Sequence, residues 1–433
     1  HKKDNAKHIF CFPLHDEASN ITFNPLHAIS NYDAHFIKQV HETLFKENEQ
    51  TGEIEGNLLF HYESLDYRKW RFILRKGIYF HNLKLVQAED VLYSLERLVE
   101  LAKPYFDFEK IEIIHDYELV LTLSNPFALL PHLLTSFRTV ILPKEHADGF
   151  IGCGAFMLEK QSKQRLQLKT FDHYFNTRPY IDGIDVIFAN NGTDLGISYL
   201  PYQKSIAQRT VLIQDVGADY VVLNCKTGPL QQEEMRETIY ALIHADDFVS
   251  VDQQEIVATG WLPNSKPIGN NATIKCAGIS FPNLTIGFQQ IHPGANHFNK
   301  ALILQNQLIA HGISSTIKCI DLQQSSELDD SIDIFIGGAI IGRQKVISIL
   351  NKFFTRPKAI LSLLDNHNKQ IILNKLETIY SGRLMYSYEQ VFQDIEQHLQ
   401  KMYCMKFLTQ HQHHLYIRED FNYQNLQFDE KGF

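Results

Sequence analysis

The 433-residue sequence predicts an α/β protein with mixed sheets, and two observations carry this prediction. Extended segments and amphipathic helices alternate along the chain instead of forming separate blocks. The clearest β-α-β unit joins a strand at 284–288 to a strand at 315–320 through a helix at 298–311, which ends at Gly312. Another apolar strand follows at 332–336.

The first half of the chain alternates strands with two helices. Residues 32–45 place Phe36 and Val40 on one helical face. Residues 88–101 form the strongest predicted helix, because acidic side chains in its first turn complement the helix dipole and Pro104 follows its end. Apolar or alternating patterns predict strands at 58–62, 70–75, 111–114, 118–123, 155–158, 165–168, 184–188 and 220–223, and a further helix at 233–244.

Composition places the chain among ordinary globular proteins and excludes several classes of function. Apolar residues make up 44% of the sequence and charged residues 21%. At roughly 150 residues per domain, the length predicts about three domains or two large lobes. Segment 127–134 is one of the longest apolar runs, and it falls far short of the ~20 residues of a membrane span. The net charge of −9 excludes a basic nucleic-acid surface over the whole chain.

The cysteines predict a reducing environment. They are scattered, without a C-x-x-C motif, and most lie in apolar, strand-like contexts, so we expect free buried thiols. One or two disulfides between lobes remain the alternative. The six positions are Cys11, Cys153, Cys225, Cys276, Cys319 and Cys404.

Three patterns raise the question of catalysis or metal binding, and each has a simpler interpretation. His411, His413 and His414 could offer imidazole ligands, but their spacing implies no further partner. Cys153 between two glycines lacks a base tied to it by a local motif, so a tight turn explains it better. The glycines at 337, 338 and 342 lack the spacing of a phosphate-binding turn. We therefore predict a protein that is not an enzyme, with no cofactor and no metal site.

One stretch carries a recognisable signature. Residues 70–81, read as strand, glycine turn and strand, lead to an acid-capped helix that opens with Ala88-Glu-Asp-Val91. This arrangement resembles the signature of the family 5 extracellular solute-binding proteins, the oligopeptide and dipeptide binders of ABC importers. Asn24-Pro25-Leu26, Gly152–Phe156 and Ile181–Asp185 also match that family, and the resemblance spans nearly the whole chain.

The resemblance implies a periplasmic-binding-protein-like fold of type II. Two lobes would close over an interlobe cleft by hinge motion. Lobe I would consist of residues 1–38, 151–222 and 403–433, a smaller inserted domain would fill 39–150, and lobe II would cover 223–402.

The chain departs from the peptide binders of this family at the expected ligand site. Those proteins follow a strand with G-W-x-x-D-x-x-D-P, whose Asp anchors the peptide ammonium. Here the segment 332–342 reads Ile-Asp-Ile-Phe-Ile-Gly-Gly-Ala-Ile-Ile-Gly, and Asp333 matches only the Asp within the strand. A buried ammonium without its carboxylate is costly, so a peptide ligand is disfavoured.

A subfamily fits these departures better. The chain resembles the C-terminal solute-binding domain of SgrR-type transcriptional regulators at 129–134, 140–145, 171–186 and the tail 426–433. Those regulators carry an N-terminal winged-helix DNA-binding domain and sense sugar-phosphate stress. Residue 1 is His rather than Met, so we expect a processed or truncated product, which agrees with a cytoplasmic domain cut from a longer protein.

We therefore expect the solute-binding sensory domain of a cytoplasmic SgrR-like regulator, with a small polar ligand between its lobes. By resemblance the ligand is a sugar phosphate, and DNA is contacted only through a separate N-terminal domain. The alternative is an extracellular, lipid-anchored substrate-binding protein of an ABC importer for oligopeptides or nickel complexes. Neither places a membrane span in this chain.

Five residues are candidates for ligand binding. Arg138 could hold an anion, and Trp261 could stack on a sugar face. Asn24 and Tyr32 flank the end of the N-terminal strand, and Asp333 lies on a central strand. The competing interpretations are a surface salt bridge for Arg138, core packing for Trp261 and a structural carboxylate for Asp333.

Overall fold

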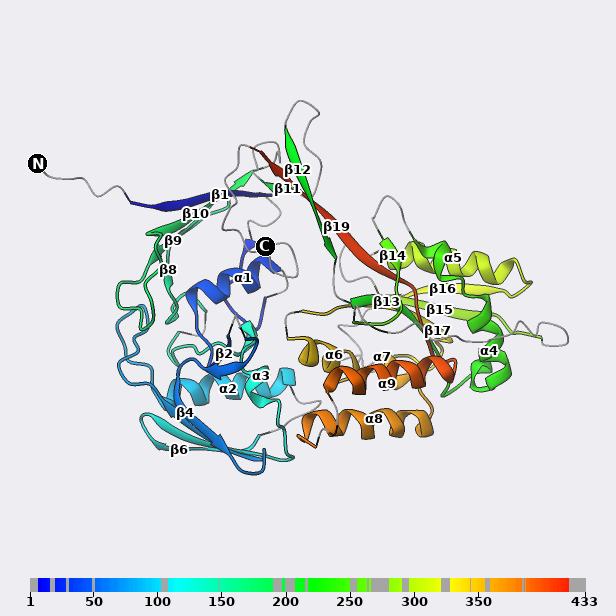
Figure 1. The fold of residues 1–433 in the computed structure, drawn as a ribbon, viewed down its shortest axis with the longest axis horizontal. Helices are drawn as coiled ribbons and strands as arrows, with labels where there is room; N and C mark the ends of the chain where they lie inside the picture. Colours follow the sequence, from blue (N-terminus) through cyan, green and yellow to red (C-terminus); the bar gives the residue numbers. More distant parts are fainter. Residues whose placement is uncertain are drawn as a thin grey trace, which may run out of the picture. The chain divides into compact units, whose positions relative to one another are not determined.

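The chain forms two compact units in the computed structural model (Figure 1). The first unit comprises His1–Ser198 and Tyr380–Gly382, and the second comprises Tyr199–Ile379 and Arg383–Phe433. Cys276 and the tail at 426–433 lie outside the described residues. The structure describes residues 7–15, 20–28, 31–48, 51–102, 108–146, 148–189, 197–198, 207–214, 217–249, 255–262, 265, 280–289, 296–320, 328–342, 344–354, 359–383, 385 and 387–419.

The first unit contains a four-stranded sheet covered by a helix. Its strand order is β1 (Ile9–His15), β10 (Gly183–Ala189), β9 (Arg165–Thr170) and β8 (Phe156–Gln161), with β1 parallel to β10 and the other pairs antiparallel. Helix α1 (Asn31–Val40) packs Phe36 and Val40 into the core on this sheet, together with Leu166 and Val186.

A second antiparallel sheet in the first unit has the order β4 (Leu59–Ser64), β5 (Lys69–Leu74), β7 (Glu118–Leu123) and β6 (Phe108–His115). On β5, Trp70, Phe72 and Leu74 are buried and alternate with exposed or half-buried residues, as period two requires. Helix α2 (Ala88–Ala102) buries Val91 and Leu95. The smaller elements are β2 (Phe45–Glu47), β3 (Ile54–Gly56), α3 (Leu130–Leu133), the 3₁₀ turn η2 (Phe137–Thr139) and β11 (Ile197–Ser198).

The second unit is built on a mixed five-stranded sheet. Its order is β16 (Ser315–Ile320), β15 (Leu284–Gln289), β17 (Ile334–Ile340), β13 (Gly217–Leu223) and β18 (Met405–Phe407). The first three strands are parallel, and β13 runs antiparallel to both neighbours. β12 (Gln208–Gln214) and β14 (Glu255–Val257) both pair with β19 (Thr409–Arg418).

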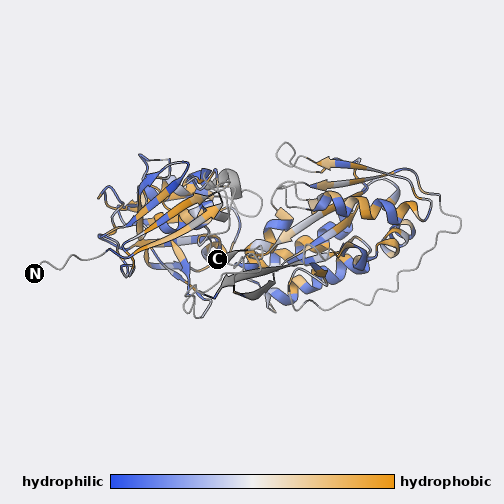
Figure 2. Ribbon diagram, turned by 90° about the horizontal axis from the view of Figure 1, so that it is seen from above, coloured by the Kyte–Doolittle hydropathy of each residue, from blue (hydrophilic) through white to orange (hydrophobic). Residues whose placement is uncertain are grey.

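Helices cover both faces of this sheet, and Figure 1 shows α5 and α9 on opposite sides. Alternation along β13 explains this, because Val221 and Leu223 join the core under α5, whereas Tyr220 contacts Trp261 on the other face. In Figure 2 the helices of this unit carry both hydropathy colours, as amphipathic helices do. The helices are α4 (Glu233–Leu242), α5 (His297–Ile309), α6 (Lys345–Phe354), α7 (Ala359–Ser362), α8 (Asn366–Tyr380) and α9 (Tyr388–Lys401), with 3₁₀ turns η4 (Pro229–Gln231) and η5 (Ala245–Phe248).

The helix predicted at 32–45 ends five residues early. The carbonyl oxygens of Val40, Glu42 and Leu44 accept hydrogen bonds from backbone N–H groups of distant segments, so the chain leaves the helix and enters β2. The strand predicted at 332–336 begins at Ile334, which leaves Asp333 just before it. Within the described residues, no helix is both long and apolar enough to span a membrane.

Candidate functional site

A buried polar cluster lies in the second unit, beside the carboxyl ends of the parallel strands β15 and β17. We define it as Asp219, Glu255, His297, Lys300 and Thr409. Lys300 projects from α5 and is 1% exposed. Its ammonium donates hydrogen bonds to the Asp219 carboxylate, to Glu255 Oε1 at 2.6 Å and to the Thr409 hydroxyl. These acceptors use all three N–H bonds of the ammonium.

His297 extends the polar cluster. Its Nδ1 lies 2.8 Å from the Gln289 carbonyl oxygen, and its Nε2 lies 3.4 Å from Asp219 Oδ1. Both neighbours accept hydrogen bonds, so both ring nitrogens must donate, which favours the imidazolium form. Burial and the nearby Lys300 oppose that charge, but the Asp219 carboxylate and the Gln289 carbonyl oxygen together outweigh them, and the pKa of His297 is raised.

Local sequence explains how the polar cluster fits into a core. Lys300 belongs to the buried stripe of α5, between His297 and Leu304. Gly338 on β17 leaves room for the Asp219–His297 pair. A Cβ at Gly338 would lie 2.2 Å from Asp219 Oδ1 and 3.0 Å from His297 Nε2. A larger side chain at this position would therefore displace the carboxylate.

A second lysine approaches the same end of β17 from α6. Lys352 Nζ donates a hydrogen bond of 3.4 Å to the Gly338 carbonyl oxygen. Burial lowers the pKa of Lys352, and the nearby Asp219 carboxylate opposes that shift in part. Among the described residues this is the one hydrogen bond of the Lys352 ammonium, which has three N–H donors. Lys352 can therefore donate to a further acceptor.

Asp333 lies at the opposite, amino end of β17. Its Oδ2 accepts a hydrogen bond of 2.8 Å from the backbone N–H of Thr285. Burial raises the pKa of Asp333, while the Thr285 N–H opposes that shift. Asp333 and Lys352 therefore lie near opposite ends of β17. Its ligand contact stays a prediction.

Trp261 lies in the core of the second unit and is 0% exposed. Its ring meets Phe353 and Phe407 edge-on, with ring centroids 5.5 and 5.3 Å away. Its backbone N–H donates to Glu396 Oε1 at 2.7 Å, and burial raises the pKa of Glu396 to about 7. This environment favours the core-packing interpretation, and stacking on a sugar stays a prediction.

The other three predicted residues belong to the first unit, where the turn at 24–28 brings two of them together. Arg138 donates to the carbonyl oxygens of Pro25 and Ala28 at 3.2 and 3.0 Å. Asn24 Oδ1 accepts a hydrogen bond from Arg97 at 3.1 Å. Tyr32 is half-buried on α1, and burial raises its pKa. These contacts brace the turn, and the ligand roles of Asn24, Arg138 and Tyr32 stay predictions.

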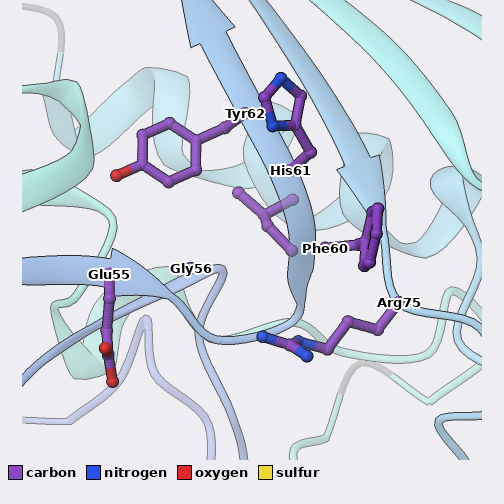
Figure 3. Close-up of a pocket in the computed structure, with 7 residues that line it drawn as sticks. Glu55, Gly56, Phe60, His61, Tyr62 and Arg75 are labelled. Atoms are coloured by element: carbon purple, nitrogen blue, oxygen red, sulfur yellow. The ribbon is translucent and has the colours of Figure 1, made fainter.

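A pocket of about 270 Å³ opens on the first unit beside the edge strand β4. Figure 3 shows Glu55, Tyr62 and Arg75 around it, from different segments of the chain. Arg75 Nε is already bonded to the Asn57 carbonyl oxygen at 2.9 Å. The lining carries side chains of both charge signs, Glu55 and Arg75. Within the described residues, no group of three or more His, Cys, Asp or Glu side chains could hold a metal ion.

The sequence-based analysis missed the polar cluster and Lys352. One signal was present, since a lysine and a histidine interrupt an otherwise apolar stripe on the helix at 297–309. Asp219 likewise is the one charged residue of β13, a strand whose seven residues are all buried. Sequence spacing offers no signal that Glu255 and Thr409 meet Lys300, because β14–β19 pairing joins segments about 150 residues apart.

Comparisons with known proteins point to one family. The sequence model described as "Bacterial extracellular solute-binding proteins, family 5 Middle" matches residues 53–275. The uncharacterized protein YhjP of Bacillus subtilis (strain 168) is 25% identical over 425 residues, which cover 95% of this chain and 73% of YhjP. The HTH-type transcriptional regulator SgrR of Escherichia coli (strain K12) is 26% identical over 332 residues, which cover 73% of this chain and 59% of SgrR.

The fold comparison agrees with the sequence comparison. The oligopeptide-binding protein AppA from Bacillus subtilis, solved in complex with a nonapeptide, has a TM-score of 0.68 at 16% identity. The match covers 98% of this chain and 97% of AppA. This likeness confirms the predicted periplasmic-binding-protein-like fold of type II.

Proposed function

The chain belongs to the bacterial extracellular solute-binding proteins of family 5, and on that premise we propose that it is the solute-sensing domain of an SgrR-like transcriptional regulator. The chain spans 59% of the SgrR relative. In this proposal the DNA-binding function belongs to a separate N-terminal domain, and the protein works in the cytoplasm. The ligand is a small anionic solute of the sugar-phosphate class.

The observation that carries the anionic ligand is Lys352. In the peptide binders that this chain resembles, a Trp directly follows the glycine after this strand, and an Asp lies three residues beyond that Trp. The corresponding residues here are Ala339 and Gly342, and the Lys352 ammonium is bonded to Gly338. A ligand ammonium about 4 Å from Lys352 would meet a repulsion of about 4 kcal/mol at an effective dielectric constant of 20. A phosphate would instead gain a charge-assisted hydrogen bond.

Signalling requires that the ligand prefer one conformation of the domain. Only a difference in affinity between two states shifts the equilibrium between them. A phosphate supplies such a difference when it is hydrogen-bonded to Lys352 in one conformation and only to water in the other. The attached DNA-binding domain then responds to the conformation that is populated.

The alternative function is a lipid-anchored receptor for an ABC importer, and the likeness to AppA supports it. The residues that precede position 1 in the full-length protein separate the two functions. A winged-helix sequence of about 100 residues, the size of one domain, supports the regulator. A signal peptide followed by a lipid-attachment cysteine contradicts it.

A thermal-shift panel tests the ligand class. Hexose 6-phosphates, the free hexoses, inorganic phosphate and a tripeptide are added separately to the purified chain. A ligand at about 100 times its Kd stabilises the folded state by about 2.7 kcal/mol. We expect a rise in unfolding temperature with a sugar phosphate and none with the free sugar. A rise with the tripeptide alone contradicts the proposal and favours the importer receptor.

A further inference from the structure

Two cysteine thiols are in contact inside the second unit. Cys225 Sγ and Cys404 Sγ lie 2.9 Å apart, and both side chains are buried. A disulfide bond needs about 2.05 Å between the sulfur atoms. A movement of less than about 1 Å would therefore bring the two atoms to bonding distance.

The backbone holds both cysteines in place. Cys225 follows β13, and its N–H donates to the Leu363 carbonyl oxygen at 2.7 Å. Cys404 precedes β18, and its N–H donates to the Leu399 carbonyl oxygen at 2.8 Å. The strands are joined directly beside the thiols, because Leu223 N–H donates to the Cys404 carbonyl oxygen at 2.8 Å. These backbone hydrogen bonds therefore hold the two cysteine residues beside each other.

We propose that Cys225 and Cys404 form a redox-controlled disulfide, closed by exchange with a small disulfide such as glutathione disulfide. One cysteine, as thiolate, attacks a sulfur of glutathione disulfide, forms a mixed disulfide and releases one glutathione thiolate. The second cysteine loses its proton to solvent, attacks the protein sulfur of the mixed disulfide and releases the second glutathione. The two cysteines lose two electrons and two protons, and one glutathione disulfide becomes two glutathione molecules.

The environment of the thiols determines when exchange is fast. The contact with Cys225 and burial raise the pKa of Cys404 far above its usual range, so the thiolate is scarce in the folded protein. Exchange is therefore slow in the native state and fast during folding, when both thiols are accessible. The proposal is independent of the proposed ligand, because it rests on the two sulfur atoms alone.

The bond would have structural and cellular consequences. It would link residues 179 positions apart in the sequence, which restricts the unfolded chain. It would also tie β13, which carries Asp219, to β18, which leads directly into Thr409. Oxidising compartments keep such bonds closed and the cytosol keeps them open. The pair would thus report the compartment in which the protein folded.

Refolding in a glutathione buffer tests the proposal. The whole chain is refolded from urea with reduced and oxidised glutathione, free thiols are alkylated in acid, and peptides are identified by mass. We expect a linked peptide pair containing Cys225 and Cys404, a rise in unfolding temperature and reversal of both by dithiothreitol. Native protein in the same buffer should form the link more slowly.

Matched variants identify the pair. Cys225→Ser and Cys404→Ser should each abolish the linked peptide, whereas Cys11→Ser, at an exposed cysteine of the first unit, should leave it unchanged. Peptide mapping of the wild-type protein shows whether Cys225 and Cys404 are linked, even where a serine variant fails to fold. The proposal is wrong when the reagent alkylates both Cys225 and Cys404 of wild-type protein refolded in the oxidising buffer, because both thiols are then still reduced. Random linkage of these residues to any of the other four cysteines, Cys11, Cys153, Cys276 or Cys319, contradicts it equally.

Discussion

Lys300 and Lys352 are two lysines of the second unit that lie near the same carboxylate, Asp219, and differ in how their charge is satisfied. Lys300 has three hydrogen-bond acceptors, two of them carboxylates. Within the part of the chain that the structure describes, Lys352 is bonded to one carbonyl oxygen at 3.4 Å. A fully paired ammonium holds secondary structure together and has nothing left for a ligand, whereas an incompletely paired one can bind an anion. Neighbouring charges of the same type can therefore have different roles.

The largest expected effect comes from removing Lys300. Lys300→Met removes the ammonium that the buried Asp219 and Glu255 carboxylates share, and we expect a loss of about 3–5 kcal/mol of unfolding free energy. Urea denaturation followed by circular dichroism measures it. Lys318→Met is the control, because Lys318 forms an exposed ion pair with Asp329 at 2.9 Å and should cost only about 0–1 kcal/mol. Equal effects of the two variants would show that the polar cluster is not structurally important.

Glu396 shows what burial does to a carboxyl group held by a backbone N–H instead of an ammonium. Burial raises its pKa to about 7 in the folded chain, from an ordinary value of 4.5. The folded state thus binds the proton of Glu396 more tightly than the unfolded state does. The stabilisation that this proton contributes is complete below about pH 4.5 and is lost as the pH rises to 7. At 1.36 kcal/mol per pKa unit the loss is about 3 kcal/mol.

Glu396→Gln tests this pH dependence. The variant keeps an oxygen acceptor for the Trp261 N–H and cannot ionise, so its unfolding free energy should lack this decline between pH 4.5 and 7. Chemical denaturation at a series of pH values compares it with wild type. Parallel curves for the two proteins would mean that Glu396 titrates normally. Glu389→Gln, at a half-buried position in the first turn of the same helix, is the control.

The smallest expected effect on stability comes from Lys352. Lys352→Met removes an ammonium whose burial is poorly compensated, so the unfolding free energy should change by no more than about 1 kcal/mol in either direction. The same denaturation assay measures it beside Lys300→Met. A loss as large as that of Lys300→Met would remove the distinction between the two lysines.

Regular patterns in the sequence predicted much of the fold. The helix that begins at Ala88 and the strand that begins at Ser315 were predicted within one residue, because their apolar periods are unbroken. Helix α9 was not predicted, since it buries Glu396 and Gln400 among apolar residues and so interrupts its own stripe. The division into lobe I, an inserted domain and lobe II stays a prediction.

The candidate site was much harder to predict than the fold. Asp219, Glu255 and Lys300 meet only through the sheet pairings of β13, β14 and β19 and the packing of α5, and sequence spacing does not encode such contacts. Lys352 carries no motif at all. Asn24, chosen because it flanks a strand end, and Arg138, chosen as a possible anion holder, do share one turn, but their hydrogen bonds go to neighbouring protein groups.

Calorimetric titration of a hexose 6-phosphate into wild type and Lys352→Gln tests the central claim, that the incompletely paired Lys352 binds the anionic group of the ligand. A hydrogen bond to a charged group contributes about 1.5–3 kcal/mol, so we expect the variant to bind about tenfold more weakly or worse. Lys345→Gln, on the first turn of the same helix, should bind like wild type. Equal affinity of wild type and Lys352→Gln would contradict the claim.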